Sequence, residues 1–456
     1  MYPITYVREH ADQVRRGLED RFRPTDVVDR FLAVDARWKA TTDELNRLRA
    51  RRNAESRRIA DSRKRDPAAP AASSDEVVRL RAEMDRLERL LAELDEERRQ
   101  ALLEIPQIPH PSVPRGRDAS ANVVVDTFRP KRSTIEHPRP HFEIAHELNL
   151  LDEERGAKVA GEGFYFLWGD LARLEHALLR FMRELHVARG YLECAPPIVV
   201  NSDSMFGTGQ LPKFADDSYR VERDDLWLVP TAEVPVTNAF RDEVLLPDDL
   251  PLRLVAYTPC FRREASGHGV ETRGIARVHQ FDKVELVSLS RPESSYDELE
   301  VLRAEAEEVL RRLDLPYRVV NLSTGDLPDK AAKCYDLELW APGSQRWLEV
   351  SSVSNFETYQ ATRARIRYRP VPGGPAEFVH TLNGSGTALA RLVIAILENY
   401  QTEDGGIEIP EVLRPSFDGR TRLEATPWIG ERELARGRRP ASRSRPSPSP
   451  ASPSPP

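Results

Sequence analysis

The stretch from residue 260 to residue 287 holds charged and aromatic residues that recur two positions apart. Arg262 and Glu264 form the first pair, and the second set is His279, Phe281, Lys283 and Glu285. Because side chains two apart on a strand point to the same face, we expect two adjacent strands to present both sets to one concave surface. Taken alone, the pattern also fits a charged sheet face with a salt-bridged Arg262 and Glu264. We expect the glycine-rich link at residues 266–269 to be mobile.

A second candidate lies at residues 381–386, where a glycine-containing turn is expected to open an apolar helix carrying Arg391 near its start. Backbone N–H donors, the helix dipole and a guanidinium would then lie together, which favours binding of phosphate. A buried helix with a snorkelling arginine fits the same residues equally well.

Two shorter patterns add oxygen ligands. Glu349 follows a strand-like segment, and we expect it to face the same way as Ser351, so that a carboxylate and hydroxyls are available to Mg²⁺. Thr231 and Glu233 offer a hydroxyl and a carboxylate suited to an ammonium group, although an ordinary turn explains that tripeptide as well.

Upstream, a basic helical segment suggests a long polyanion as partner. Residues 46–65 contain nine basic side chains and two acidic ones, a local balance of 9 − 2 = +7. Leucine and methionine alternate three and four residues apart from Leu80 to Leu94, which predicts the apolar seam of a coiled coil. Prolines at 67 and 70 separate two such helices, so we expect an antiparallel hairpin whose helices of about 30 to 35 residues form a rod on the order of 50 Å long.

The remaining chain divides into three parts. Residues 105–114 are proline-rich and are expected to form a stiff, extended spacer. From about residue 119 to residue 417, short apolar runs alternate irregularly with helical patterns, which favours an α+β domain built on an antiparallel sheet. After Trp428 the chain is rich in Arg, Pro and Ser, and we expect a disordered tail.

Composition limits the remaining possibilities. The 456 residues carry 67 basic and 74 acidic side chains, a net charge of −7, which argues against a uniformly basic nucleic-acid binder. No apolar run approaches the roughly 20 residues that span a bilayer, and the first residues show no signal-peptide pattern, so a cytoplasmic location without membrane association is expected. Three widely spaced cysteines argue against a disulfide framework, and no zinc is expected.

In this order, the motifs resemble those of the seryl-tRNA synthetases, which are class II aminoacyl-tRNA synthetases, up to about residue 424. The segments that carry the resemblance are the helical hairpin, IPHPSVP at 108–114, GYLECAPP at 190–197, GTGQLPKF at 207–214, TAE at 231–233, residues 260–287, EVSS at 349–352 with SNF at 354–356, TLNGSG with Arg391, and IEIPEVLRP at 407–415. The resemblance implies a tRNA-binding hairpin domain at 1–115, a class II catalytic domain with an antiparallel sheet flanked by helices at 116–425, and a tail at 426–456.

The resemblance also implies a reaction. ATP and L-serine would form seryl-adenylate, and the seryl group would pass to tRNA(Ser), with tRNA(Sec) as a further acceptor. The catalytic residues implied are Arg262, Arg391 and Glu349. The ATP-binding residues implied are Arg262, Arg263, Glu264, Val278, Phe281, Glu349, Val350, Ser351, Ser352 and Arg391. The serine-binding residues implied are Thr231, Ala232, Glu233, Arg262, Glu285 and Ser385.

Further partners follow from the same resemblance. Mg²⁺ would be held by Glu349 and Ser352, and the protein would be a homodimer. The residues implied in tRNA binding are Arg47, Arg51, Arg52, Arg57, Arg58, Arg63 and Lys64. Positions that depart from the usual family pattern are Arg263, Ser266, Val270, Thr362 and Ala390. Two alternatives stay open: a specialised or resistant paralogue supplying seryl-tRNA to a secondary pathway, and an inactive tRNA-binding module.

Overall fold

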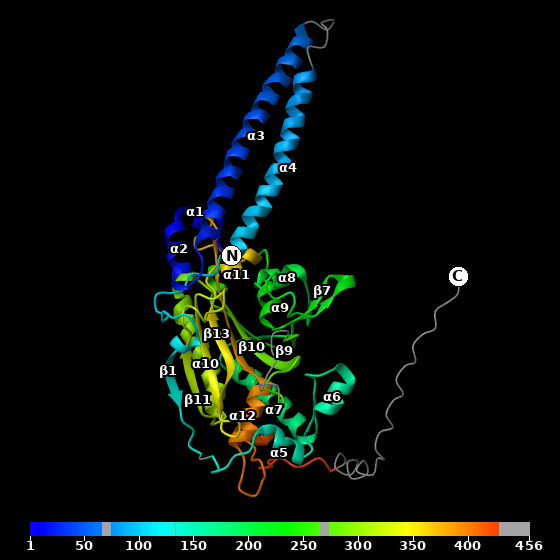
Figure 1. Ribbon diagram of the computed structural model, residues 1–456, viewed down its shortest axis with the longest axis vertical. Helices are drawn as coiled ribbons and strands as arrows, with labels where there is room; N and C mark the ends of the chain where they lie inside the picture. The colour runs from blue at the N-terminus through cyan, green and yellow to red at the C-terminus, as the bar shows by residue number, and fades with distance from the viewer. Residues whose placement is uncertain (66–73, 133, 265–272, 428–456) are drawn as a thin grey trace, which may run out of the picture.

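A computed structural model describes residues 1–65, 74–132, 134–264 and 273–427. Two long helices project together from a larger body that holds the strands (Figure 1). The N-terminal helices are α1 (Ile4–Glu9), α2 (Ala11–Asp20), α3 (Asp26–Arg65) and α4 (Ser74–Glu104). The predicted hairpin is therefore confirmed. The expected disordered tail and the expected mobile link at 266–269 lie outside the described residues.

The predicted apolar seam holds the two long helices together. Leu45 of α3 packs with Met84 and Leu87 of α4, and all three side chains are buried. Helix α4 has 31 residues, within the expected length, but α3 has 40. Helix α3 is longer because its first turns continue below the rod, where Val28 and Phe31 join a separate apolar cluster with α1 and α2.

A buried carboxylate fixes the base of the hairpin. Asp35 of α3 accepts two hydrogen bonds of 2.6 Å from Arg8 of α1 and one of 3.1 Å from Arg98 of α4. Burial alone would raise the pKa of Asp35, but the hydrogen bonds from Arg8 and Arg98 outweigh it and hold that pKa below its usual value. One side chain thus joins three helices.

The proline-rich connector is packed against the body through backbone hydrogen bonds. Helix α4 ends at Glu104, two residues before Pro106. Beyond it, the N–H of Gln107 donates to the carbonyl of Asp329, and the N–H of His110 donates to the carbonyl of Ala332. Because both acceptors belong to one loop of the body, the connector attaches the hairpin to that loop.

The body is built on an eight-stranded sheet in the order β1-β11-β12-β13-β16-β10-β9-β4, which confirms the α+β prediction. All neighbours are antiparallel except β4 and β9, which are parallel. The strands are β1 (Val123–Phe128), β4 (Leu192–Cys194), β9 (Leu252–Phe261), β10 (Gln280–Ser290), β11 (Tyr317–Asn321), β12 (Lys333–Ala341), β13 (Arg346–Asn355) and β16 (His380–Ala388).

Three long helices pack against this sheet and supply most of its core (Figure 1). They are α7 (Gly169–Ala188), α10 (Ser295–Arg312) and α12 (Leu389–Asn399). The charges at the ends of helix α10 complement the helix dipole, because acidic residues lie in its first turn and arginines in its last. The shorter helices are α5 (His141–Glu147), α6 (Glu153–Ala160), α8 (Ser202–Gly207), α9 (Glu233–Asn238) and α11 (Tyr359–Ala364).

Small sheets and turns complete the body. The small sheets comprise β2 (Leu151–Asp152), β3 (Phe166–Leu167), β5 (Val199–Asn201), β6 (Arg220–Val221), β7 (Leu226–Leu228), β8 (Val244–Leu245), β14 (Arg367–Tyr368) and β15 (Glu377–Phe378). Short 3₁₀ helices lie at Ala119–Ala121, Glu222–Asp224, Pro247–Asp249, Pro292–Ser294 and Glu411–Phe417. Within the described ranges, no helix is long and apolar enough to cross a membrane.

The predicted turn at residues 381–386 is wrong, because these residues form the middle of β16 between β10 and β13. The glycines there allow close packing and do not make a turn. A Cβ at Gly384 would lie 3.3 Å from Leu302 and Val353, and one at Gly386 would lie 3.2 Å from His186 and Val284. The helix that follows begins at Leu389, so Arg391 still lies in its first turn.

The carboxylate at the base of the hairpin yields a stability prediction. Asp35→Ala should lower the free energy of unfolding by about 3 to 5 kcal/mol, because it removes the buried partner of Arg98 and leaves that guanidinium only the exposed Asp95. Asp29→Ala is the matched control, since the Arg15–Asp29 pair is exposed and worth at most about 1 kcal/mol. Urea unfolding followed by circular dichroism measures both, and equal effects would contradict the role given to Asp35.

Candidate active site

One cavity of about 770 Å³ opens on the sheet, against β10, β13 and β16. It brings together residues that are up to 391 − 210 = 181 positions apart in the chain. The predicted site residues that line it are Thr231, Glu233, Arg262, Glu264, Val278, Phe281, Glu349, Val350, Ser351, Ser352, Ser385 and Arg391. Three more predicted residues lie around it: Ala232 is fully buried in the wall, Glu285 is fully buried in the floor, and Arg263 is exposed.

Arg262 lies just past the end of β9, so the prediction that Arg262 and Glu264 share a strand face is wrong. Strand β9 ends at Phe261, and Glu264 has a φ of 48°, which turns the chain away from the sheet. The N–H of Arg262 still donates to the carbonyl of His279 at 2.9 Å, which keeps its backbone beside β10. Its guanidinium lies 5.1 Å from the centre of the Phe281 ring.

Turning Glu264 away gives it a different arginine as partner. Its carboxylate accepts a hydrogen bond of 2.7 Å from Arg277, and both side chains line the cavity. The salt bridge between Arg262 and Glu264 that the sequence allowed is therefore replaced by one between Glu264 and Arg277. Arg262 is left to face the cavity with its guanidinium.

The second cavity arginine, Arg391, is held by backbone oxygens. It donates to the carbonyl of Glu349 at 2.6 Å and contacts the carbonyl of Ala276 at 3.5 Å, while the Glu349 carboxylate lies 3.9 Å away. Ala390, which precedes it, is buried under the first turn of α12. A guanidinium fixed mainly by neutral carbonyls keeps its charge available to an anion.

A bulge in β13 decides which oxygen atoms meet beside Arg391. The pairing with β12 shifts at Val350, since Leu337 faces Ser351 whereas Glu338 faces Glu349. Glu349 therefore lies beside Ser352, whose hydroxyl approaches it at 3.3 Å, while the Ser351 hydroxyl donates to the carbonyl of Ser385. The expectation that Glu349 and Ser351 face the same way is wrong, because the extra residue reverses the alternation.

Beneath Ser352 lies a second carboxylate, Asp336. The Ser352 hydroxyl donates to Asp336 at 2.6 Å. Burial, reinforced by the nearby Glu349 carboxylate, raises the pKa of Asp336 well above its usual value. Glu349 and Ser352 thus present hard oxygen ligands to the cavity above another acid, a donor set that suits a divalent cation bound to phosphate.

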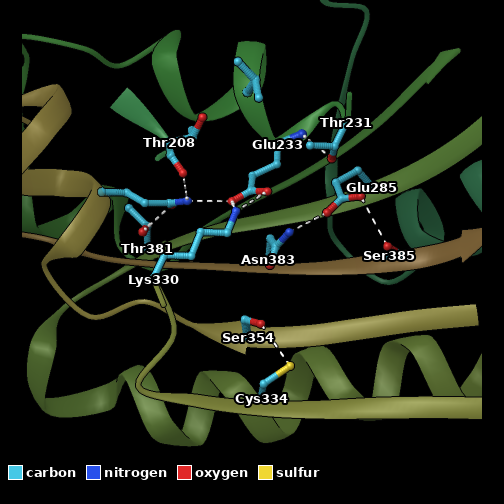
Figure 2. A network of polar contacts seen from close by, with 12 residues as sticks. Thr208, Thr231, Glu233, Glu285, Lys330, Cys334, Ser354, Thr381, Asn383 and Ser385 are labelled. Carbon is cyan, nitrogen blue, oxygen red and sulfur yellow. Dashed lines mark hydrogen bonds and ion pairs between the residues drawn. The ribbon is translucent and has the colours of Figure 1, made fainter. Parts of the chain in front are cut away.

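The other end of the cavity is a polar pocket around Glu233 (Figure 2). The N–H of Glu233, the first residue of α9, donates to the Thr231 hydroxyl at 3.2 Å, so the TAE tripeptide leads into a helix. The Glu233 carboxylate accepts from Lys330 at 2.7 and 2.9 Å and from the Gln360 amide at 2.5 Å. Gln360 is itself oriented by a hydrogen bond from Thr381.

A second acid, Glu285, lies beside this pocket on β10. It accepts a hydrogen bond from Asn383 at 2.7 Å and one from Ser385 at 3.5 Å, both on the neighbouring strand β16 (Figure 2). Lys283 forms an ion pair with Glu285 and donates to the Thr231 hydroxyl at 2.8 Å. The pocket therefore combines two carboxylates, two ammonium groups and several hydroxyl and amide groups.

Sequence reasoning assigned no role to several of these side chains. Lys283 was visible as a neighbour of Glu285, and Asn383 lies inside the TLNGSG string, so both had a signal. Lys330, Gln360 and Asp336 had none, because they reach the cavity from distant elements. Among the departures from the family pattern, Arg263 points outward and Thr362 lies in α11, while Ser266 and Val270 lie outside the described residues.

The basic residues predicted to contact tRNA all lie in the second half of α3, one of the two helices that project from the body (Figure 1). Arg47, Arg57 and Lys64 are exposed, and among the described residues no acidic side chain forms an ion pair with them. Three other predicted tRNA contacts have local partners: Arg51 pairs with Glu76, Arg58 pairs with Glu55, and Arg52 donates to Asn53. The side chain of Arg63 lies outside the described part.

Two family models match the chain. Residues 1–109 match the seryl-tRNA synthetase N-terminal domain, and residues 219–400 match the class II tRNA synthetase core domain of the G, H, P, S and T enzymes. A serine–tRNA ligase of Thermomicrobium roseum is 52% identical over 448 residues, which cover 97% of this chain and 99% of the relative. One of Halorubrum lacusprofundi is 50% identical and covers 94% and 98%.

Solved structures give the same match in three dimensions. The seryl-tRNA synthetase of Pyrococcus horikoshii, complexed with ATP, superimposes with a TM-score of 0.85 at 35% identity, covering 93% of this chain and all of that one. The cytoplasmic serine–tRNA ligase of Naegleria fowleri, in complex with AMP, has a TM-score of 0.80 at 29% identity, covering 91% and 96%. Similarity therefore extends across both the hairpin and the body.

Proposed function

The chain belongs to the seryl-tRNA synthetase family, and we infer that it is a serine–tRNA ligase, which activates L-serine with ATP and transfers the seryl group to tRNA(Ser). The observation that carries this inference is the division of one cavity into two ends. Arg262, Phe281 and Arg391 line one end, and the acids Glu233 and Glu285 lie at the other. The first suits an aromatic polyanion, and the second suits a small ligand with an ammonium and a hydroxyl.

Catalysis by this site depends on positioning and charge. A carboxylate oxygen of serine attacks the α-phosphorus of ATP, the bond to the bridging oxygen breaks, and pyrophosphate leaves with the electron pair. A terminal ribose hydroxyl of tRNA then attacks the carbonyl carbon of seryl-adenylate, and AMP leaves. No protein nucleophile takes part, so the residues lower the barrier by aligning the reactants and by neutralising developing charge.

We assign the residues as follows. Arg262 contacts the α-phosphate and the attacking carboxylate, and Arg391 contacts the γ-phosphate of a bent triphosphate. Phe281 stacks on adenine. Glu264 and Val278 border the adenosine, and the exposed Arg263 approaches it from outside. Because Arg391 donates to the carbonyl of Glu349 and the Nε of Arg262 contacts the carbonyl of Pro230, both guanidiniums are placed before the anion binds and need little reorganisation.

Glu349 and Ser352 would hold the Mg²⁺ that accompanies ATP. Their oxygen atoms lie at the cavity surface beside Arg391, with Val350 and Ser351 placing them through the bulge. When bound, the ion neutralises phosphate charge. An exchange reaction that continues undiminished after chelation of divalent cations would contradict this assignment.

Selection of serine follows from the polar pocket. We propose that four polar residues surround the amino acid: Thr231, Glu233, Glu285 and Ser385. Between the first two lies the buried Ala232, whose side chain is only a methyl group. Alanine would leave buried polar groups without hydrogen bonds, which is costly, while threonine has to be excluded by shape. Polarity therefore contributes more to selection than size alone.

We propose that the hairpin, within residues 1–115, grips tRNA phosphates with its exposed arginines. The positions proposed above, from Arg47 to Lys64, lie far along the rod, where a long RNA can be held away from the body. tRNA(Sec) is proposed as a further acceptor. Since ATP and tRNA are intracellular, a cytoplasmic location is proposed too.

A homodimer is proposed because one edge of the sheet is apolar and exposed. Strand β4 ends the eight-stranded sheet with only three residues, and Leu192 on it is 61% exposed. Val187, Ile198 and Val199 are exposed nearby in sequence. A second copy would cover this edge and its unpaired backbone groups.

An inactive tRNA-binding module is disfavoured by this site. A module without catalysis has no physical need for Arg262, Glu349 and Arg391 to line one cavity. The paralogue alternative uses the same chemistry, so it changes the pathway supplied and not the reaction.

Arg262→Ala should reduce serine-dependent ATP–pyrophosphate exchange by about 10²- to 10³-fold, because it removes a preorganised donor from the reacting phosphorus. Arg262→Lys is the matched variant: it keeps the charge but loses the planar fork, so we expect intermediate activity. The assay with all twenty amino acids identifies the substrate of the wild type. Wild-type exchange by Arg262→Ala would contradict the assigned role.

Changing Arg47, Arg57 and Lys64 together to Ala should weaken tRNA binding, and with it tRNA charging, because three phosphate contacts are lost. The slope of the logarithm of the tRNA binding constant against the logarithm of the salt concentration should become shallower by about two units. Pyrophosphate exchange, which needs no tRNA, is the internal control and should be unchanged. Deleting residues 47–74 should impair tRNA charging more severely and should still leave pyrophosphate exchange unchanged. Equal loss in both assays would show that the hairpin is not a separate tRNA lever.

Leu192→Asp should shift the sedimentation coefficient from that of a dimer to that of a monomer, because it places a charge at the centre of the exposed apolar edge. Val78→Asp is the matched control, since Val78 is 60% exposed on the hairpin. A wild-type protein that sediments as a monomer would refute the proposed dimer.

A further inference from the structure

The acid proposed to bind the serine ammonium already has a cation. Lys330 donates to both oxygens of Glu233, at 2.7 and 2.9 Å, and Gln360 donates to one of them at 2.5 Å (Figure 2). Glu233 is almost fully buried, so its charge needs a partner within the protein. The ammonium of a ligand and that of Lys330 would compete for one carboxylate.

Lys330 differs from the other lysine of the pocket in how firmly it is held. The Lys283 side chain is 6% exposed and bridges Glu285 and Thr231, whereas the Lys330 side chain is 18% exposed and hydrogen-bonds only Glu233 among the described residues. The Lys330 ammonium also lies 4.7 Å from the centre of the Phe356 ring. That ring offers the ammonium a favourable contact when it leaves the carboxylate.

The loop that carries Lys330 is attached to the N-terminal domain. Arg21, at the end of α2, donates to the carbonyls of Leu327, Pro328 and Ala331 at 3.0, 3.3 and 2.6 Å, and to that of Gln107 at 2.7 Å. Arg21 is buried, and burial lowers its pKa to about 10, which leaves it charged at neutral pH. One guanidinium therefore fixes the loop backbone on both sides of Lys330.

We propose that Lys330 determines the affinity and selectivity of the serine pocket, by occupying Glu233 as a counter-cation that the substrate ammonium must replace. Arg21 is the positioning residue that keeps Lys330 in place, so the N-terminal domain contributes to amino acid recognition. This inference rests on the proposed serine pocket. A ligand without an ammonium cannot replace Lys330, because it would leave Glu233 buried and uncompensated.

The direction of the effect follows from the charges. Without Lys330, the free protein holds an unpaired buried carboxylate, which is unfavourable, and a bound serine supplies the missing cation. Serine binding therefore becomes stronger when the lysine is removed, although the free protein becomes less stable. A lysine that merely shaped the pocket would have the opposite effect on serine.

Lys330→Met, which keeps the length of the side chain, tests this in pyrophosphate exchange. The KM for serine should fall about 10-fold, and the KM for ATP should not change. The melting temperature should be lower without serine and should rise more on adding serine than in the wild type. Arg23→Ala is the matched control, because it removes an exposed ion pair with Asp329 on the same loop and should change neither KM.

Lys330→Gln guards against misfolding of the methionine variant, since its amide can still donate to Glu233 without a charge. It should also lower the KM for serine. An unchanged or higher KM in a folded Lys330 variant overturns the inference. A wild type that shows no serine-dependent exchange overturns the proposed function instead, so the two failures are distinguishable.

A double-mutant cycle tests the role of Arg21. Arg21→Ala should lower the KM for serine in the wild-type background, because the loop no longer holds Lys330 on Glu233. In the Lys330→Met background the same change should leave that KM unaltered. Additive effects of the two changes would mean that Arg21 acts on the pocket by another route, and would refute its positioning of Lys330.

Discussion

The pairing of β10 with β9 and β16 is the constraint on which the site depends. This antiparallel register places Glu285 opposite Ser385 and beside Asn383, and brings Lys283 next to Thr231. A shift of one residue would turn Lys283 and Glu285 toward the core, away from Thr231, Asn383 and Ser385. Because the two buried charges neutralise each other within one strand, the sheet itself can form the floor of a polar cavity.

Elements with a regular sequence pattern could be predicted, whereas side-chain directions that depend on irregular backbone could not. The hairpin, the antiparallel sheet and the approach of Arg391 to the cavity follow from periodicity and from motifs that lie close in the chain. The bulge at Val350 and the positive φ of Glu264 reverse the direction of a side chain, and neither has a pattern to reveal it. The TLNGSG string was misassigned because glycine in a packed central strand looks like glycine in a turn.

Residues that reach the site from distant elements could not be predicted, because no local sequence pattern links them to it. Lys330 lies in an irregular loop nearly a hundred positions after Glu233, and Gln360 reaches the same carboxylate from a third segment. Their contact depends on how the loop before β12 is anchored, and much of that anchoring comes from Arg21 and Gln107 in the N-terminal part. Packing across the whole chain, and not local pattern, completes the pocket.

Because of this anchoring, the hairpin and the body are connected at the loop that carries Lys330. A free spacer would let the rod move without affecting the cavity, but residues 105–110 and Arg21 are hydrogen-bonded to the loop that carries Lys330. The cavity also contains opposite charges at both ends, since acids accompany the arginines and lysines accompany the acids. Binding of an ammonium group at Glu233 must therefore exchange one ion pair for another, and the strength of the Lys330–Glu233 pair that is broken affects how tightly the ligand is held. At Glu233 that pair involves a loop that Arg21 holds by its backbone carbonyls, so the base of the hairpin is connected to the polar pocket.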